Sequence, residues 1–87
     1  MTLAFPNRSR SYDAARKAIR FLGYDGTFEV PFFIEVQALK PAQPAADNET
    51  RYLAAFDAAR ISIQDVAREV YSHGRKRLYV LTAHDFR

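Results

Sequence analysis

The stretch that decides the fold of this 87-residue chain is Lys17-Ala18-Ile19-Arg20-Phe21-Leu22-Gly23-Tyr24-Asp25-Gly26-Thr27-Phe28-Glu29-Val30-Pro31-Phe32-Phe33. It reads as two strands, 17–24 and 27–33, joined by Asp25-Gly26. Asp-Gly is a strong signal for a two-residue hairpin loop, because a type I′ turn needs positive φ at both central residues. The stretch therefore predicts a β-hairpin.

The register of this hairpin follows from the apolar pattern. A two-residue loop gives these pairs: Tyr24 with Thr27, Phe21 with Val30, and Ile19 with Phe32. All the apolar partners then share one face of the sheet. A three-residue loop would place Phe21 opposite Glu29 and mix core with surface, so the pattern favours the short loop.

The remaining strands are expected to extend the sheet on one side of this hairpin. Pro31 has no N–H to give to a neighbour, which predicts that the strand 27–33 lies at an edge. A short strand 2–5 and a last strand 77–82 are then expected on the other side of 17–24. The Ser- and Arg-rich segment 7–15 reads as a connecting loop.

After a short helical turn at 35–39 and a Pro-containing loop at 40–48, the chain is expected to be helical to Ser72. Residues spaced by three and four form one continuous stripe: Leu53, Phe56, Arg60, Ile63, Ala67 and Val70. Asp47 or Asn48 is expected to be the N-cap, and Gly74 the C′ residue. A capping-like Ser62-Ile63-Gln64-Asp65 and a length of roughly 36 Å argue for a break near 60–62. The unbroken stripe favours a single helix.

These elements predict one α+β domain over residues 1–87. It would have two layers, an antiparallel sheet of three to four strands in the order β-β-β-α-α-β, with one long helix packed across one face. A chain of this length has room for only one core. Its 48% apolar and 26% charged residues are typical of folded domains and argue against disorder or a fibrous protein.

Several classes of site find no support in the sequence. Without cysteine there is no disulfide, no thiolate nucleophile and no sulfur-rich zinc site. His73 and His84 lack neighbours at metal-binding spacing, so no metal or other cofactor is expected. His84-Asp85 could act as a base with its orienting carboxylate, but a solvated tail histidine is favoured, and an enzyme is the least favoured reading. The apolar runs are too short for a membrane helix, and a cytoplasmic location is expected.

Charge is distributed unevenly along the chain. Residues 1–20 carry five cations and one acid, residues 21–73 four cations and eight acids, and residues 74–87 four cations and one acid. The basic ends could form a weak anion or nucleic-acid patch, made of Arg8, Arg10, Arg16, Lys17, Arg75, Lys76 and Arg77. The alternative is that these side chains are simply solvated.

Arg60 is distinctive because it interrupts the apolar helical stripe. A guanidinium there either extends past its neighbours to water or meets a carboxylate, which fixes how the helix sits. Asp57, three positions earlier, is the available partner on the helix, and Asp13 or Asp25 could come from a loop. The functional alternative is that Arg60 binds an anion.

Aromatic residues divide between a predicted core and a predicted open face. The core is expected to contain Phe5, Phe21, Phe28, Phe32 and Phe56. The opposite face, which no helix is available to cover, is expected to carry Leu22, Tyr24, Phe33 and Tyr79. Such a patch is typical of an interface. It suggests a non-catalytic interaction module that binds a second copy or another protein through this face or through an edge strand, with no membrane partner.

The order of motifs along the chain resembles a small bacterial family, domain-of-unknown-function family 1488. The resemblance rests on Leu3-Ala4-Phe5-Pro6-Asn7, Tyr12-Asp13, Ile19-Arg20-Phe21 to Tyr24-Asp25-Gly26, the helix with Phe56, Arg60 and Ile63, and Leu81-Thr82-Ala83-His84-Asp85-Phe86. It implies a compact α+β fold in a bacterial cytosolic protein. It implies no activity and assigns no functional residues.

Overall fold

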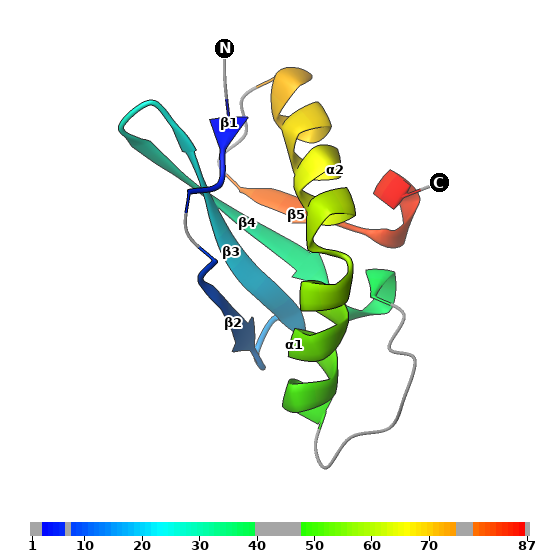
Figure 1. The fold of residues 1–87 in the computed structure, drawn as a ribbon. Coiled ribbons are helices and arrows are strands. Elements are labelled where there is room, and N and C mark those ends of the chain that lie inside the picture. Colours follow the sequence, from blue (N-terminus) through cyan, green and yellow to red (C-terminus); the bar gives the residue numbers. More distant parts are fainter. Residues whose placement is uncertain (1–2, 7, 40–47, 75–77, 87) are drawn as a thin grey trace.

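The described residues form a mixed sheet of five strands and two α-helices. Both helices lie across one face of the sheet (Figure 1). The computed structural model describes residues 3–6, 8–39, 48–74 and 78–86. Its elements, in chain order, are β1 (Leu3–Ala4), β2 (Arg10–Asp13), β3 (Ala18–Asp25), β4 (Phe28–Glu35), η1 (Val36–Ala38), α1 (Asn48–Ala58), α2 (Arg60–Ser72), β5 (Tyr79–Leu81) and η2 (Ala83–Phe86). The α+β class is confirmed, and the sheet is mostly antiparallel.

The β3–β4 hairpin is present, but its loop lies one residue later than predicted. Asp25 pairs with Phe28, so that Gly26 and Thr27 form the loop. Gly26 has φ +64°, whereas Thr27 is not among the residues with positive φ. This is the pattern of a type II′ turn, which takes glycine at its first central position, and not of the predicted type I′ turn. Asp25 belongs to the sheet because it also pairs with Leu3 of β1.

The shift of the loop changes which residues of β3 and β4 pair, but each side chain stays on its predicted face of the sheet. Each strand residue is displaced by two positions relative to the predicted pairing, so Phe21 lies opposite Phe32 and Ile19 opposite Ile34. A displacement of two keeps every side chain on its predicted face, because the side-chain period of a strand is two. Phe21, Phe32 and Ile19 are buried, which confirms the predicted core face.

The expected edge position of β4 is wrong. β5 pairs in parallel with Phe32, Phe33 and Ile34 on the side of β4 away from β3. The other side of β3 is already taken by β1 and β2, so the last strand can join the sheet only beyond β4. Pro31 is tolerated because the pairing with β5 begins one residue after it.

Strand β2 lies inside the segment that was predicted to be a loop. Residues 10–13 pair antiparallel with 18–21 of β3. The ring of Tyr12 lies 5.8 Å from that of Tyr52 on α1, and Tyr12 packs against the core. The Ser- and Arg-rich composition did not indicate a strand. The side chains at positions 10 and 12, which lie on one face of β2, contact α1.

The predicted single helix is in fact two helices that break at Ala59. Ala59 has φ −110° and ψ 15°, outside the helical region, and α2 begins at Arg60. The sequence arguments for a break near residue 60 therefore hold. The stripe itself is also confirmed, since Phe56, Arg60, Ile63 and Ala67 are all buried. One irregular residue interrupts the helix without rotating this stripe away from the sheet, and so periodicity alone could not detect it.

The core lies between the helices and the facing side of the sheet. Its largest fully buried side chains are Phe32, Phe56, Ile19, Ile34, Ile63 and Leu81. Phe28 was expected there but is 76% exposed, because it follows the hairpin loop at the tip of the sheet. Gly23 allows close packing, since an added Cβ would lie 2.9 Å from the Cε1 atom of Phe5 and the Phe5 ring would have to move.

Candidate functional site

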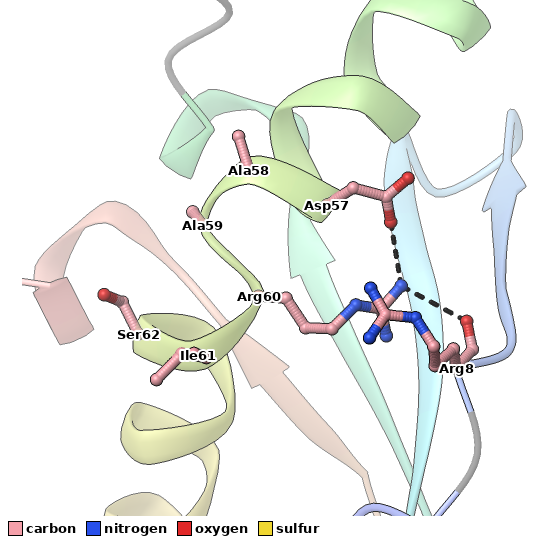
Figure 2. A pocket seen from close by; sticks show the side chains of 7 residues that line it. All are labelled: Arg8, Asp57, Ala58, Ala59, Arg60, Ile61 and Ser62. Atoms are coloured by element: carbon pink, nitrogen blue, oxygen red, sulfur yellow. Dashed lines mark hydrogen bonds and ion pairs between the residues drawn. The ribbon is translucent and has the colours of Figure 1, made fainter.

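Arg60 is a buried guanidinium held at the break between α1 and α2. It is 8% exposed, and its Nη2 atom donates to the Asp57 Oδ1 atom at 2.8 Å and to the backbone oxygen of Arg8 at 3.2 Å. The guanidinium also lies over the Phe56 ring, 4.9 Å from its centroid. Figure 2 shows the Arg60 guanidinium between the Asp57 carboxylate and the Arg8 carbonyl, with a hydrogen bond to each. The predicted pairing of Arg60 with Asp57 is therefore confirmed.

Asp57 is shared between two arginines. Arg10 on β2 donates from Nε to Oδ1 at 2.9 Å and from Nη2 to Oδ2 at 2.8 Å, a bidentate pair that joins β2 to α1. These hydrogen bonds are the main cause that lowers the pKa of Asp57 below its usual value, against the opposing effect of burial. The same hydrogen bonds raise the pKa of Arg10. Asp57 therefore stays ionised between its two arginines.

A pocket opens beside this cluster at the helix break. It has a volume of about 210 Å³ and is lined by Arg8, Asp57, Ala58, Ala59, Arg60, Ile61 and Ser62. The short side chains of Ala58 and Ala59 leave the backbone of the break accessible. Figure 2 shows the Ser62 side chain on the side of the break away from Asp57, so its hydroxyl lies apart from the charged cluster. The pocket is thus formed by a guanidinium pair, one carboxylate and exposed backbone.

Hydrogen-bond donors at this pocket are left without partners in the described part of the chain. The Nε atom of Arg60 has no hydrogen-bond partner there, but it is fully buried and is not exposed to the pocket. The exposed side chain of Arg8 likewise makes no hydrogen bond or ion pair with the described residues. The N-cap of α2 is Ala59, which provides no side-chain cap for the first N–H groups of the helix. The pocket therefore contains more donor capacity than the protein itself uses.

The predicted basic patch is only partly assembled. Arg8 and Arg10 lie together beside Arg60, but Arg16 lies over the Phe33 ring, 4.6 Å from its centroid, on the other face of the sheet. Lys17 is exposed in the turn between β2 and β3 and has φ +51°. Arg75, Lys76 and Arg77 lie outside the described residues. The structure thus separates Arg16 from the cluster at the break.

The predicted interface residues do not all lie on the open face. The predicted position of Tyr79 on the open face is wrong, because Tyr79 is buried in the core. Its ring centroid lies 5.0 Å from that of Phe32 and 5.5 Å from that of Tyr71. Phe33 is on the open face, but it is only 7% exposed and covered in part by Arg16. Leu22 and Tyr24 are half-buried on that face, where Leu22 pairs with Pro31 and the Tyr24 hydroxyl donates to Glu29 at 3.4 Å.

The described residues contain no candidate metal site. In this part of the chain no three His, Asp or Glu side chains come together as a possible metal site. Its helices are also too short or too polar to cross a membrane. His73 and His84 are exposed, and the Asp85 carboxylate accepts a hydrogen bond from the Thr82 N–H at 2.8 Å. Asp85 thus closes the turn that begins η2.

Sequence reasoning missed the pairing of Arg10 with Asp57. The two residues are 47 positions apart, and Arg10 was placed in a loop, so nothing local indicated that they meet. The signal that could have found them is the alternation of positions 8, 10 and 12, which is compatible with one face of a strand. Arg60 was recognised because it stands in an apolar stripe.

Comparison with known proteins identifies the family of the chain. Residues 3–82 match the family described as "Protein of unknown function (DUF1488)". The comparisons with curated proteins and with solved structures found no match. The family match covers β1 to β5 together with the cluster around Arg60. The chain therefore belongs to the DUF1488 family.

Proposed function

We propose that this protein binds a phosphate-type anion in the pocket at the break between α1 and α2. The observation that carries the proposal is the exposed Arg8 guanidinium, which makes no hydrogen bond or ion pair with the described residues and lines the pocket together with Arg60 and the start of α2. A charged donor of this kind forms its strongest hydrogen bonds with the oxygens of an anion.

The charges around the pocket favour an anion. Arg8 and Arg60 line the pocket with one carboxylate, that of Asp57, which also binds Arg10, so the three arginines and Asp57 together have an excess of two positive charges. Arg10 and Arg60 both donate to Asp57, so the guanidinium that has no carboxylate partner among the described residues is that of Arg8. Partly buried charges of this kind are less screened by salt than exposed ones.

The start of α2 adds to the same effect. This helix runs for 13 residues, and its first N–H groups have no side-chain cap. The partial positive charge of a helix N-terminus favours a bound anion. The pocket volume of about 210 Å³ is below the roughly 300 Å³ typical of sites for whole drug-sized ligands. The proposed ligand is therefore small, or presents only its phosphate group to the protein.

The proposal can be tested by titrating the isotope-labelled protein with inorganic phosphate and following its amide resonances by NMR. We expect saturable shifts at Arg60, Ile61 and Ser62. Arg8→Ala should weaken binding by about fivefold to tenfold, equivalent to about 1 kcal/mol for one charged contact. The matched control is Arg20→Ala, which removes the same charge from the other face of the sheet. Absence of shifts at the start of α2, or equal weakening by both variants, would contradict the proposal.

A second candidate function is self-association through the open face of the sheet, and its support is the composition of that face. Leu22, Pro31, Phe33 and Val80 lie on the face opposite to the packed core, while α1 and α2 both lie across the other face (Figure 1). Sedimentation velocity over a wide concentration range tests this candidate. A species that remains monomeric at the highest concentration would exclude it.

Three further assignments remain proposals of the same kind. A non-catalytic role is favoured because the cluster at the helix break pairs its only carboxylate with two arginines. A bacterial cytosolic location rests on the family resemblance. Nucleic-acid binding is less favoured than binding of a small anion, because Arg16 lies on the other face from the cluster. Binding of duplex DNA would instead show a steep loss of affinity with salt.

A further inference from the structure

We infer that two copies of this chain pack through the open faces of their sheets with their strands running in opposite directions. This inference rests on the second candidate function above and names the arrangement of the dimer. The open face has an apolar centre, formed by Leu22 and its partner Pro31, with Phe33 and Val80 beside them. Both α1 and α2 lie across the other face of the sheet (Figure 1).

Opposite charges flank this apolar centre along the strands. Arg20 lies two residues from Leu22 at one end, and Glu29 lies two residues from Pro31 at the other. Both charges are on the open face, because they alternate with buried core residues. Arg20 makes no hydrogen bond or ion pair with the described residues. The exposed Glu29 carboxylate accepts a hydrogen bond from the Tyr24 hydroxyl at 3.4 Å.

Within one copy these two charges are too far apart to pair. Arg20 lies opposite Phe33, whereas Glu29 lies opposite Tyr24, which is four residues further along β3. At a rise of roughly 3.3 Å per residue, this places the two charges about 13 Å apart along the strands. An ion pair between an arginine at position 20 and a glutamate at position 29 can therefore form only between two molecules.

A two-fold axis through the apolar centre brings these charges together across an interface. If the axis crosses the strands at Leu22 and Pro31, each Leu22 faces the same residue of the second copy. Arg20 then faces Tyr24 and Glu29 of the second copy, and the symmetry makes this contact twice. An axis parallel to the strands would instead place Arg20 level with Arg20 of the second copy, where like charges repel. The charge pattern is therefore self-complementary only when the strands run in opposite directions.

The acidic side chains at the Arg20 end of the face are compatible with this arrangement. Asp13 forms an ion pair with Arg16 at 3.8 Å, so these two charges offset each other. Glu35 lies opposite Ala18, four residues beyond the axis. In the dimer it is level with Gly26 of the second copy, which carries no charge.

The size of the face predicts a weak dimer. β3 and β4 have eight residues each, and β2 and β5 lie on either side of them. Four strands of roughly 26 Å in length and about 19 Å in total width give roughly 500 Å² on each copy. This is below the about 800 Å² that each partner buries in a stable complex. The dimer therefore forms only at high protein concentration.

The test measures dimerisation of the intact protein by sedimentation at low salt, up to the highest soluble concentration. Arg20→Glu and Glu29→Arg should each weaken the dimer about tenfold or more, because each replaces two attractions by two repulsions. The double variant Arg20→Glu/Glu29→Arg should recover the wild-type affinity to within about threefold. This recovery requires contact between copies, since the two positions are too distant to meet within one chain. An unfolded variant could not produce it.

The matched control is Glu69→Arg. Glu69 is exposed on α2, and this variant has the same change in charge as Glu29→Arg but carries it on the helical side of the molecule. It should leave dimerisation unchanged. Weakening equal to that of Glu29→Arg would show an effect of net charge alone and would overturn the inference.

The remaining outcomes separate this inference from the candidate function on which it rests. A wild-type protein that stays monomeric throughout would overturn both, and would leave the open face to a different partner or to solvent. A wild-type dimer that neither single variant weakens would keep self-association but exclude the opposed arrangement of strands. Failure of the double variant to recover would exclude that arrangement as well.

Discussion

Arg60 combines packing with charge, and two substitutions separate these contributions. Its side chain lies over the Phe56 ring and is 8% exposed, so much of its value to the fold is the volume it fills. We expect Arg60→Met to cost about 1 kcal/mol, because the Arg8 carbonyl loses its donor while the volume is kept. Arg60→Ala should cost about 2 to 4 kcal/mol, because it also leaves a cavity.

Chemical denaturation of both variants measures these differences. Arg60→Met should lose phosphate binding even though it keeps most of its stability. If Arg60→Met were as unstable as Arg60→Ala, the charge would hold the fold together, and the argument for a binding role would fail. The result thus distinguishes an arginine that binds a ligand from one that only stabilises the fold.

Asp57 gives stability a defined dependence on pH. Hydrogen bonds from Arg10, and then from Arg60, lower its pKa in the folded chain, so the folded state holds its proton less tightly than the unfolded state. Its stabilising contribution is therefore complete above about pH 5, begins to fall near the ordinary pKa of aspartate at about 4, and is lost as the pH falls through the lower folded value.

The comparison of wild type with Asp57→Asn isolates this contribution. The difference in their free energies of unfolding should be constant from pH 7 down to about pH 5 and should shrink on further acidification. Denaturation curves at a series of pH values give this difference directly. A difference that grows as the pH falls would show that Asp57 has a raised pKa in the folded chain.

The β3–β4 hairpin offers a test of backbone conformation alone. An added Cβ at Gly26 would have no atom within 4 Å, yet φ there is +64°. Gly26→Ala should therefore lower the free energy of unfolding by about 1 to 2 kcal/mol through backbone strain only. Gly26→Asn should cost less, since asparagine tolerates positive φ. Thermal denaturation distinguishes them, and a neutral Gly26→Ala would mean that the loop has another conformation.

These elements also show how far sequence reasoning reaches. The hairpin and its core face were predictable because alternating apolar residues and a central Gly26 are local signals. The exact loop was not, because Gly26 fits either a type I′ or a type II′ turn and the pairing of Asp25 with Leu3 of β1 involves a segment distant in sequence. The break at Ala59 was suggested by local residues. The buried residues of α1 and α2 nevertheless keep the spacing of one continuous helix, so periodicity favoured a single helix, which is wrong.

The candidate site depends on contacts between distant segments and was predictable only in part. Arg60 and its partner Asp57 are three residues apart on neighbouring helical turns, which the sequence indicates. Arg8 and Arg10 join them only because β2 lies at the edge of β3, beside α1. The parallel pairing of β5 with β4 was missed for the same reason, since the space beside β3 is taken by strands from the start of the chain.

At the scale of the whole molecule, the two faces of the sheet should respond differently to the same change. Leu81 in β5 is fully buried in the core, whereas Val80 beside it is half-buried on the other face. Leu81→Asp should cost about 4 kcal/mol or more, because it removes a packed side chain and buries a charge. Val80→Asp should leave the melting temperature within a few degrees of wild type.

Calorimetry and sedimentation on this pair test the fold and the second functional candidate together. If the open face binds a second copy, Val80→Asp should remain folded and should dissociate any dimer. Equal destabilisation by both substitutions would show that the two faces are buried alike and would remove the open face from consideration.

The parallel position of β5 has a consequence for how the protein is made. The ribosome completes β4 early, but its partner on one side is synthesised only after both helices. Until then the nascent chain presents the unpaired edge of Phe32, Phe33 and Ile34, a run of apolar residues in an extended strand. Chains stalled before residue 79 should therefore be the species that aggregates, and the segment around β4 is where a chaperone should bind them.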